Sequence, residues 1–245
     1  MDTRVDEIAE GIYRLSTFLP QVGPSGLTFN QFLVDAAEPL LFHCGQRALF
    51  GAVSQAVARV MDPKRLRFIA FSHIEADECG ALGEWLDAAP GATVTHGAIG
   101  CAIWLNDQSP RPPRMLKDGD VLDLGNRRVR RLDTPHVPHC WDAGLLYEET
   151  TGTLFTSDLF THAGDPAALT EGDIVGPAVA AEKQFGYTAL TPATGATIRR
   201  LAALGPRTLA VMHGSSFSGA AASTLESLAN FYDEALQKAG PPGGR

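Results

Sequence analysis

The 245-residue chain has few cysteines, an excess of acidic over basic residues, and no long apolar run. Its four cysteines are far apart and show no CxxC spacing, so we expect neither a disulfide framework nor a cysteine-type zinc site. The formal charge of −8 argues against a nucleic-acid-binding surface, because such surfaces cluster Lys and Arg. No segment approaches the ~18 apolar residues that span a bilayer. We therefore expect a cytoplasmic protein that binds neither nucleic acid nor a membrane.

Sequence motifs for export and for nucleotide binding are also missing. The first seven residues are acidic and lack an apolar stretch, so we expect no secretory signal. Patterns of the Gly-x-Gly-x-x-Gly and P-loop types are absent as well. An apolar content of 44% is ample for a globular core, and no Gly/Ser linker or repeat divides the chain. We expect one domain over residues 1–239 and a disordered tail over residues 240–245.

Short apolar runs alternate with amphipathic segments along the whole chain. The runs predict an opening edge region over residues 11–16 and strands over residues 28–34, 39–42, 66–71, 92–96, 121–124, 128–132, 145–148, 153–155 and 208–212. Three- and four-residue apolar spacing predicts helices over residues 46–61, 76–89, 98–105, 179–185, 194–204 and 220–237. The long Gly- and Pro-rich stretch 161–192 is typical of a functional lid or a contact surface.

Potential metal ligands stand at alternate positions directly behind the apolar run 66–71. They are His73, Glu75 and Asp77. On an extended loop, residues i, i+2 and i+4 project to one side, so these side chains can converge without unusual backbone geometry. By itself the triplet has a second interpretation, because Asp77 could simply cap a helix over residues 76–89.

Three further strand ends support the metal interpretation. His136 follows the predicted hairpin, Asp158 follows the run 153–155, and His213 follows the run 208–212. Rigid strands can hold ligands at a fixed separation, and four strand ends that carry only His, Asp and Glu suit a metal site. The chain therefore predicts a metal centre at the rim of a β-structure.

The order of these residues resembles the metallo-β-lactamase superfamily over nearly the whole chain. That superfamily usually has the loop His-x-His-x-Asp-His, whereas this chain has Glu75 at the second position, which is similar to flavodiiron proteins and their stand-alone relatives, the oxygen-binding di-iron proteins. The resemblance implies an α/β (α+β) fold, a four-layer αββα sandwich with the metal cleft at one edge of the two sheets. It also implies that one metal is held by His73, Glu75 and His136, that the other is held by Asp77 and His213, and that Asp158 bridges them.

The acids of this set favour iron or manganese, because a hard carboxylate oxygen replaces an imidazole of the nitrogen-rich zinc sites. Zinc also has no redox chemistry to offer. We expect two metal ions, with iron ahead of manganese and zinc. Flavodiiron proteins have a flavodoxin-like domain after the metal domain, and this sequence ends at Arg245. We thus expect no flavin in this chain and an external electron donor. The resemblance further implies a homodimer.

Glu78 departs from the family, which usually has a His at this position. Three outcomes are open: Glu78 ligates the second metal, it hydrogen-bonds a bound water, or it leaves that site weak or empty. An acidic residue at the start of a helix also complements the helix dipole and need have no other role. His139 and His43 are interpreted as neighbours of the ligands or as ordinary loop and packing residues, and neither is expected to be a ligand.

Three functions remain possible from the sequence. The first is a di-iron protein that binds or reduces dioxygen, or nitric oxide, with electrons from an outside donor. The second is a metal-dependent hydrolase of the same fold, acting on an ester, thioester or lactone, in which Asp77 or Glu78 relays protons. The third is a non-catalytic oxygen or metal sensor. Glu75 favours the first, so we expect an oxidoreductase before a hydrolase.

Overall fold

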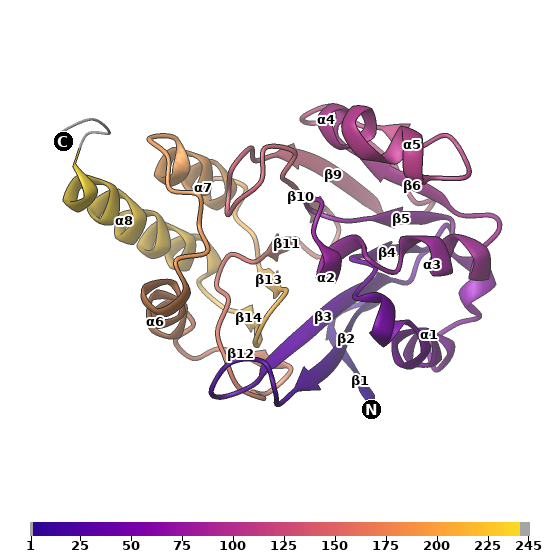
Figure 1. Ribbon diagram of the computed structural model, residues 1–245, viewed down its shortest axis with the longest axis horizontal. Coiled ribbons are helices and arrows are strands. Elements are labelled where there is room, and N and C mark those ends of the chain that lie inside the picture. Colours follow the sequence, from indigo (N-terminus) through magenta and orange to yellow (C-terminus); the bar gives the residue numbers. More distant parts are fainter. Residues whose placement is uncertain (1, 241–245) are drawn as a thin grey trace.

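Two β-sheets face each other and helices cover both outer faces in the computed structural model of the chain (Figure 1). The structure describes residues 2–240, so residues 241–245 of the predicted tail lie outside the described range. The strands of the first sheet, in spatial order, are β1 Thr3–Ala9, β2 Ile12–Leu19, β3 Leu27–Val34, β4 Leu40–Phe42, β5 Phe68–Ala70, β6 Thr93–His96 and β7 Arg114–Met115. The strands of the second sheet are β12 Leu169–Thr170, β14 Ser216–Ser218, β13 Thr208–Val211, β11 Thr153–Ser157, β10 Gly144–Glu148, β9 Arg128–Asp133 and β8 Val121–Asp123.

The helices of the N-terminal half lie on the first sheet and those of the C-terminal half on the second (Figure 1). Those on the first sheet are η1 Arg47–Leu49, α1 Phe50–Ala58, η2 Pro63–Arg65, α2 Ala76–Cys79, α3 Leu82–Ala88, α4 Ala98–Gly100, η3 Cys101–Leu105 and α5 Asn106–Gln108. Those on the second sheet are α6 Val175–Phe185, α7 Thr194–Ala202 and α8 Ala221–Ala239. No helix within residues 2–240 is both long and apolar enough to cross a membrane.

The burial pattern explains the layers, because neighbouring residues of a strand point to opposite faces. Leu33 of β3 packs with Val53 of α1 in the outer core of the first sheet. Its neighbour Phe32 instead lies between the sheets, where its ring centroid is 5.6 Å from that of Phe155 in β11. A second outer core forms under α7 and α8. Each sheet is therefore buried on both faces, and the predicted αββα sandwich is confirmed.

The strand directions bring the carboxyl ends of four strands to one edge of the sandwich. β4 and β5 are parallel neighbours in the first sheet, and β11 and β13 are parallel neighbours in the second. The carboxyl ends of parallel neighbours meet at the same edge of a sheet. His43, His73, Asp158 and His213 lie at or just beyond the ends of these four strands. This edge holds the polar cluster described below.

The predicted elements differ from the structure mainly at their ends. The predicted helix 76–89 is two short helices, α2 and α3, and the predicted helix 179–185 begins earlier, at Val175. Four strands at or near the sheet edges were not predicted: β1, β7, β12 and β14. Three of these have only two or three residues, which is too short for a recognisable periodicity.

Candidate metal centre

The loop after β5 brings His73 and Glu75 into contact. His73 is buried, and its Nε2 lies 2.9 Å from Oε2 of Glu75. Glu75 has an extended backbone (φ −144°, ψ 154°) and immediately precedes α2. Asp77 lies in the first turn of that helix, and its Oδ2 is 3.3 Å from Nε2 of His213. One loop thus supplies a donor atom beside His73 and another beside His213.

The turn between β9 and β10 presents His139 to this loop and leaves His136 exposed. His139 Nε2 lies 2.9 Å from Oε2 of Glu75 and 3.4 Å from Oδ2 of Asp158. His136 is exposed and lies in a tight turn: its N–H donates to the carbonyl of Cys140 (2.7 Å), and its φ is positive at 63°. The prediction that His136 joins the cluster is wrong, since His139 occupies that place.

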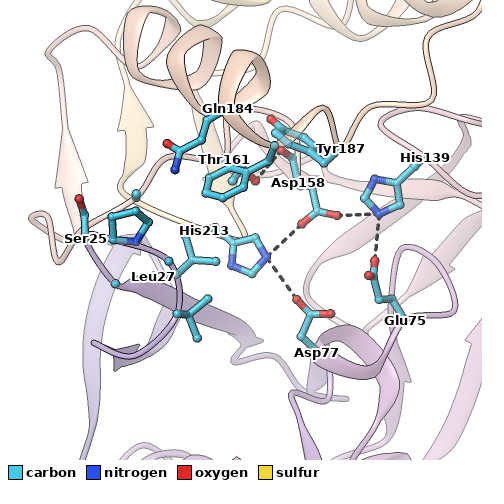
Figure 2. A pocket seen from close by; sticks show the side chains of 16 residues that line it. Ser25, Leu27, Glu75, Asp77, His139, Asp158, Thr161, Gln184, Tyr187 and His213 are labelled. Carbon is cyan, nitrogen blue, oxygen red and sulfur yellow. Dashed lines mark hydrogen bonds and ion pairs between the residues drawn. The ribbon is translucent and has the colours of Figure 1, made fainter.

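Asp158 lies between two groups of donor atoms, as Figure 2 shows. Its Oδ2 is 3.5 Å from Nε2 of His73 and 3.4 Å from Nε2 of His139, whereas its Oδ1 is 3.2 Å from Nε2 of His213. The side chain is buried, and the preceding residue, Ser157, turns the chain with a φ of 51°. One carboxylate therefore faces two sets of ligands, with a different oxygen toward each.

Two candidate metal positions follow from these contacts. The four-donor position consists of His73, Glu75, His139 and Asp158, whose ligand atoms all lie within 4.8 Å of one another. The three-donor position consists of Asp77, Asp158 and His213. Both combine imidazole nitrogens with carboxylate oxygens, a mixture that iron, manganese and zinc accept. The residues present thus fit a binuclear metal centre.

Hydrogen bonds to the backbone orient His213 for ligation. Its Nδ1 lies 2.8 Å from the carbonyl oxygen of Thr28, so Nδ1 must carry the hydrogen and Nε2 is the atom available to a metal. The next residue, Gly214, donates its N–H to Oγ1 of Thr28 (2.8 Å). Its carbonyl accepts from Arg14 Nη2 (2.9 Å) and Asn30 Nδ2 (3.0 Å). Residues of β2 and β3 therefore hold this ligand loop in place.

The metal-free cluster is a set of ionised carboxylates opposed by protonated imidazoles. Hydrogen bonds from His139 and His73 lower the pKa of Glu75 to about 2. Burial opposes the charge of His73 and His213, but the surrounding carboxylates raise the pKa of each to about 10. Burial likewise opposes the charge of Asp158, yet the hydrogen bond from His213 and the charge of His73 lower its pKa. Metal ions at these positions would displace the imidazole protons.

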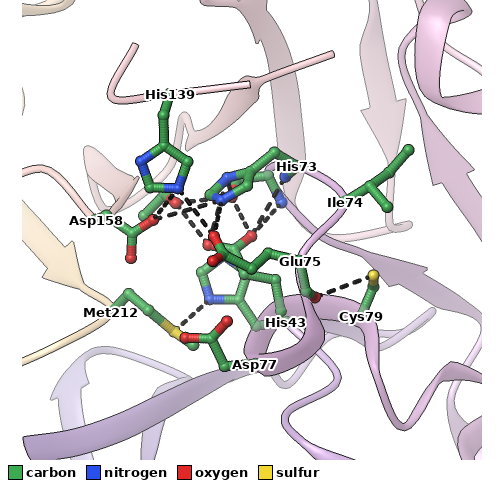
Figure 3. Close-up of polar contacts among 12 residues, drawn as sticks. His43, His73, Ile74, Glu75, Asp77, Cys79, His139, Asp158 and Met212 are labelled. Carbon is green, nitrogen blue, oxygen red and sulfur yellow. Dashed lines mark hydrogen bonds and ion pairs between the residues drawn. The ribbon is translucent and has the colours of Figure 1, made fainter. Parts of the chain in front are cut away.

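Glu78 is buried on the Nδ1 side of His73, where its Oε1 lies 3.7 Å from that nitrogen. The carboxylate accepts hydrogen bonds from the Ser72 N–H (3.0 Å) and the Ser157 hydroxyl (2.7 Å). Nε2 of His43 lies 3.3 Å from its Oε2. Figure 3 shows His43 beside the loop of His73 and Glu75, with its Nδ1 2.9 Å from the sulfur of Met212. Neither Glu78 nor His43 belongs to the two donor sets defined above.

A cavity of about 260 Å³ opens onto the cluster (Figure 2). The hairpin loop between β2 and β3 forms one wall, residues 22–27. Another part of the wall comes from the stretch 161–192, including Phe185 and Tyr187. That stretch was predicted to be a lid or contact surface, and its residues line the cavity. Glu75, Asp77, His139, Asp158 and His213 also line it, so both candidate metal positions face this space.

The sandwich and the strand-end cluster together define a protein of the metallo-β-lactamase fold with a candidate binuclear centre. Residues 27–185 match the family described as ODP family beta lactamase, and the chain belongs to that family. The resemblance to the metal domain of flavodiiron proteins is confirmed by the relatives below.

Curated relatives include a diflavin flavoprotein A 1 from Synechocystis sp., 28% identical over 169 residues, or 68% of this chain and 29% of the relative. A rubredoxin-oxygen oxidoreductase from Megalodesulfovibrio gigas is 26% identical over 141 residues, or 57% of this chain and 35% of the relative. The matched part of the chain covers between 24% and 41% of the length of these and similar curated relatives.

Solved structures share the fold at lower sequence identity. The rubredoxin oxygen:oxidoreductase from Desulfovibrio gigas superposes with a TM-score of 0.81 at 18% identity, covering 94% of this chain and 62% of that one. The flavodiiron protein from Giardia intestinalis gives a TM-score of 0.80 at 16% identity, covering 95% of this chain and 60% of that one.

Proposed function

We propose that the chain is a binuclear iron protein that binds or reduces dioxygen or nitric oxide with electrons from an external donor. The observation that carries the proposal is the donor set of the four-donor position, in which Glu75 stands with Asp158 and two histidines. Hard carboxylate oxygens favour iron or manganese over zinc. The name of the rubredoxin-oxygen oxidoreductase relative supports the same chemistry. A homodimer remains part of the proposal.

Each side chain of the centre has a distinct task in this proposal. His73, Glu75, His139 and Asp158 hold one metal ion, while Asp77, Asp158 and His213 hold the other. Iron, when bound, supplies the one-electron redox chemistry that these side chains lack. Thr28 fixes the His213 tautomer, and the cavity gives small molecules a route to the cluster.

Asp77 and Glu78 were predicted to be catalytic, and their surroundings differ. Asp77 lines the cavity, where it can act as a ligand or exchange a proton with a bound molecule. Glu78 has its hydrogen bonds on the Nδ1 side of His73 and is not among the described residues that line the cavity. We propose a direct role for Asp77 and an indirect one for Glu78.

Metal analysis combined with gas consumption tests the function. Protein purified anaerobically after growth in iron-replete medium should contain close to two iron ions per chain. After reduction with an artificial donor, it should consume dioxygen or nitric oxide, with a change in its absorption spectrum. Stoichiometric zinc with no spectral change on exposure to oxygen would contradict the proposal.

Glu75→His is the sharpest variant for this test, because it replaces the carboxylate that favours iron by an imidazole. We expect a lower ratio of iron to zinc in this variant than in the wild-type protein, purified in parallel from the same medium. Glu171→His changes an exposed acid outside the cavity in the same way and is the matched control. An unchanged metal ratio in Glu75→His would remove the main support for iron.

The size of the cavity favours one alternative, a metal-dependent hydrolase of an ester, thioester or lactone. One water molecule needs only about 10 to 15 Å³ of cavity volume, whereas this cavity has about 260 Å³ and has apolar residues such as Leu27 and Phe185 in its walls. A panel of small esters, thioesters and lactones tests this alternative. Turnover by the zinc-loaded protein that disappears in Asp158→Ala would favour the hydrolase, whereas no turnover would argue against it.

A further inference from the structure

Glu78 is the buried acid that neither candidate metal position uses. Its side chain is 1% exposed, and a carboxylate so placed needs hydrogen-bond donors. Oε2 accepts from the backbone N–H groups of Ser72 (3.0 Å) and His73 (3.3 Å) and from the Ser72 hydroxyl. Oε1 accepts from the Ser157 hydroxyl at 2.7 Å. Within residues 2–240, all these donors belong to the loop of Glu78 itself or to the end of β11.

The donors of Glu78 connect it to the four-donor position. The Ser72 hydroxyl lies 2.9 Å from Nδ1 of His73, so the carboxylate, the hydroxyl and the imidazole form a chain that ends at the ligand atom Nε2. The same hydroxyl lies 2.7 Å from the Ser157 hydroxyl, one residue before Asp158. One of the four donors, His73, is therefore oriented through a hydroxyl that Glu78 holds.

The three-donor position shares Asp158 with the other position, and within residues 2–240 neither of its own donors, Asp77 and His213, has a hydrogen bond to Glu78. Its histidine is oriented by Thr28, and Asp77 reaches it from the first turn of α2. Although Glu78 follows Asp77 in the sequence, its carboxylate is engaged by Ser72 and Ser157 instead. The position where the family usually has a histidine thus supplies no donor to this set.

We propose that Glu78 is a positioning residue of the four-donor position and not a ligand of the three-donor position. The two positions are therefore unequal, with the four-donor position binding a divalent metal more tightly. The inference rests on the binuclear site of the proposed function but not on its redox chemistry. Of the three roles left open for Glu78 by the sequence, the inference excludes ligation of the metal at the three-donor position and a hydrogen bond to a water bound there. It keeps the third, in which the three-donor position binds metal weakly.

Manganese binding to single-position variants tests the inference. Asp77→Asn removes a donor from the three-donor position, so binding in this background reports mainly on the four-donor position. His139→Asn removes a donor from the four-donor position, so binding in that background reports mainly on the three-donor position. Bound and free Mn²⁺ can be counted in metal-free protein by electron paramagnetic resonance. We expect tighter binding in the Asp77→Asn background than in the His139→Asn background.

Glu78→Gln is then added to each background. Residues that orient a ligand typically contribute 10- to 100-fold to metal affinity, so we expect roughly tenfold or greater weakening in the Asp77→Asn background and little change in the His139→Asn background. The opposite pattern, or equal weakening in both, would overturn the inference. If Glu78→Gln does not fold, Ser72→Ala breaks the link to His73 while retaining the carboxylate, and the same pattern is expected.

The outcome is independent of the reaction that the loaded protein performs. Unequal Mn²⁺ binding with the expected response to Glu78→Gln supports the inference even in a protein that consumes neither dioxygen nor nitric oxide. Gas consumption by the iron-loaded protein together with equal binding at both positions would retain the proposed function and overturn the inference.

Discussion

Replacing His139 and His136 in turn compares a candidate metal ligand with an exposed residue of the same type three positions away. His139 is one of the two nitrogen donors of the four-donor position, with its Nε2 2.9 Å from Oε2 of Glu75. His136 is exposed. The pair His139→Asn and His136→Asn therefore makes the same chemical change inside and outside the cluster.

The expected magnitudes follow from these environments. Residues that only support a ligand contribute 10- to 100-fold to metal affinity, so a direct donor should contribute at least the upper value. We expect His139→Asn to weaken binding at the four-donor position about 100-fold or more, which corresponds to ~2.8 kcal/mol. His136→Asn should change the free energy of unfolding by less than about 0.5 kcal/mol, as is usual for exposed sites, with metal affinity unchanged.

Competition with a chromogenic chelator measures the affinities, and thermal unfolding of the metal-free variants establishes that both are folded. Wild-type and His136→Asn protein should release metal at the same chelator concentration, and His139→Asn at a much lower one. Loss of metal in His136→Asn alone, or equal loss in both variants, would refute the assignment of His139 as the ligand.

Three further predictions concern stability. In the metal-free protein the pKa of Glu75 is lowered from 4.5 to about 2, so the ionised carboxylate stabilises the fold above pH 4.5 and this stabilisation is lost as the pH falls toward 2. The free energy of unfolding of Glu75→Gln, measured in urea, should therefore depend less on pH over this range than that of the wild-type protein. An unchanged pH profile would contradict the ion pairing. Phe155 is fully buried between the sheets, so Phe155→Ala should lower the free energy of unfolding by about 3 to 5 kcal/mol. A decrease of less than about 1 kcal/mol in urea denaturation would argue against the inter-sheet core. Gly144→Ala would place a Cβ 2.0 Å from Nη2 of buried Arg131 and should destabilise by about 1 to 3 kcal/mol. At Gly83 a Cβ meets open space, so Gly83→Ala should have no such cost, and equal melting temperatures for the two variants would contradict this packing.

Apolar patterning was sufficient to predict the strands that carry the candidate metal centre. β5 and β13 lie inside the predicted ranges 66–71 and 208–212, and β11 extends the range 153–155 by two residues. Strands covered on both faces appear in the sequence as nearly continuous apolar runs. β1 escaped prediction because charged residues interrupt it, as expected of a strand at the edge of a sheet.

The candidate ligands were predictable where a strand fixes them and not where a turn does. His73, Asp158 and His213 follow closely behind their strands, so locating the strand locates the side chain. His136 and His139 lie in one turn, and the path of that turn decides which of them reaches Glu75. The orientation of Glu78 depends on Ser157, far away in the sequence, and no local pattern reports such a contact.

The origin of the cavity walls has a consequence for the evolution of substrate range. The donor atoms come from strand ends and from loops that pack closely against the core, whereas the wall formed by residues 22–27 is exposed at residues 23–25. Exposed loops tolerate insertions and substitutions far better than buried strands do. Lineages could therefore diverge in the molecules that they admit while retaining the same six candidate ligands, and directed evolution confined to this hairpin could change selectivity without rebuilding the centre.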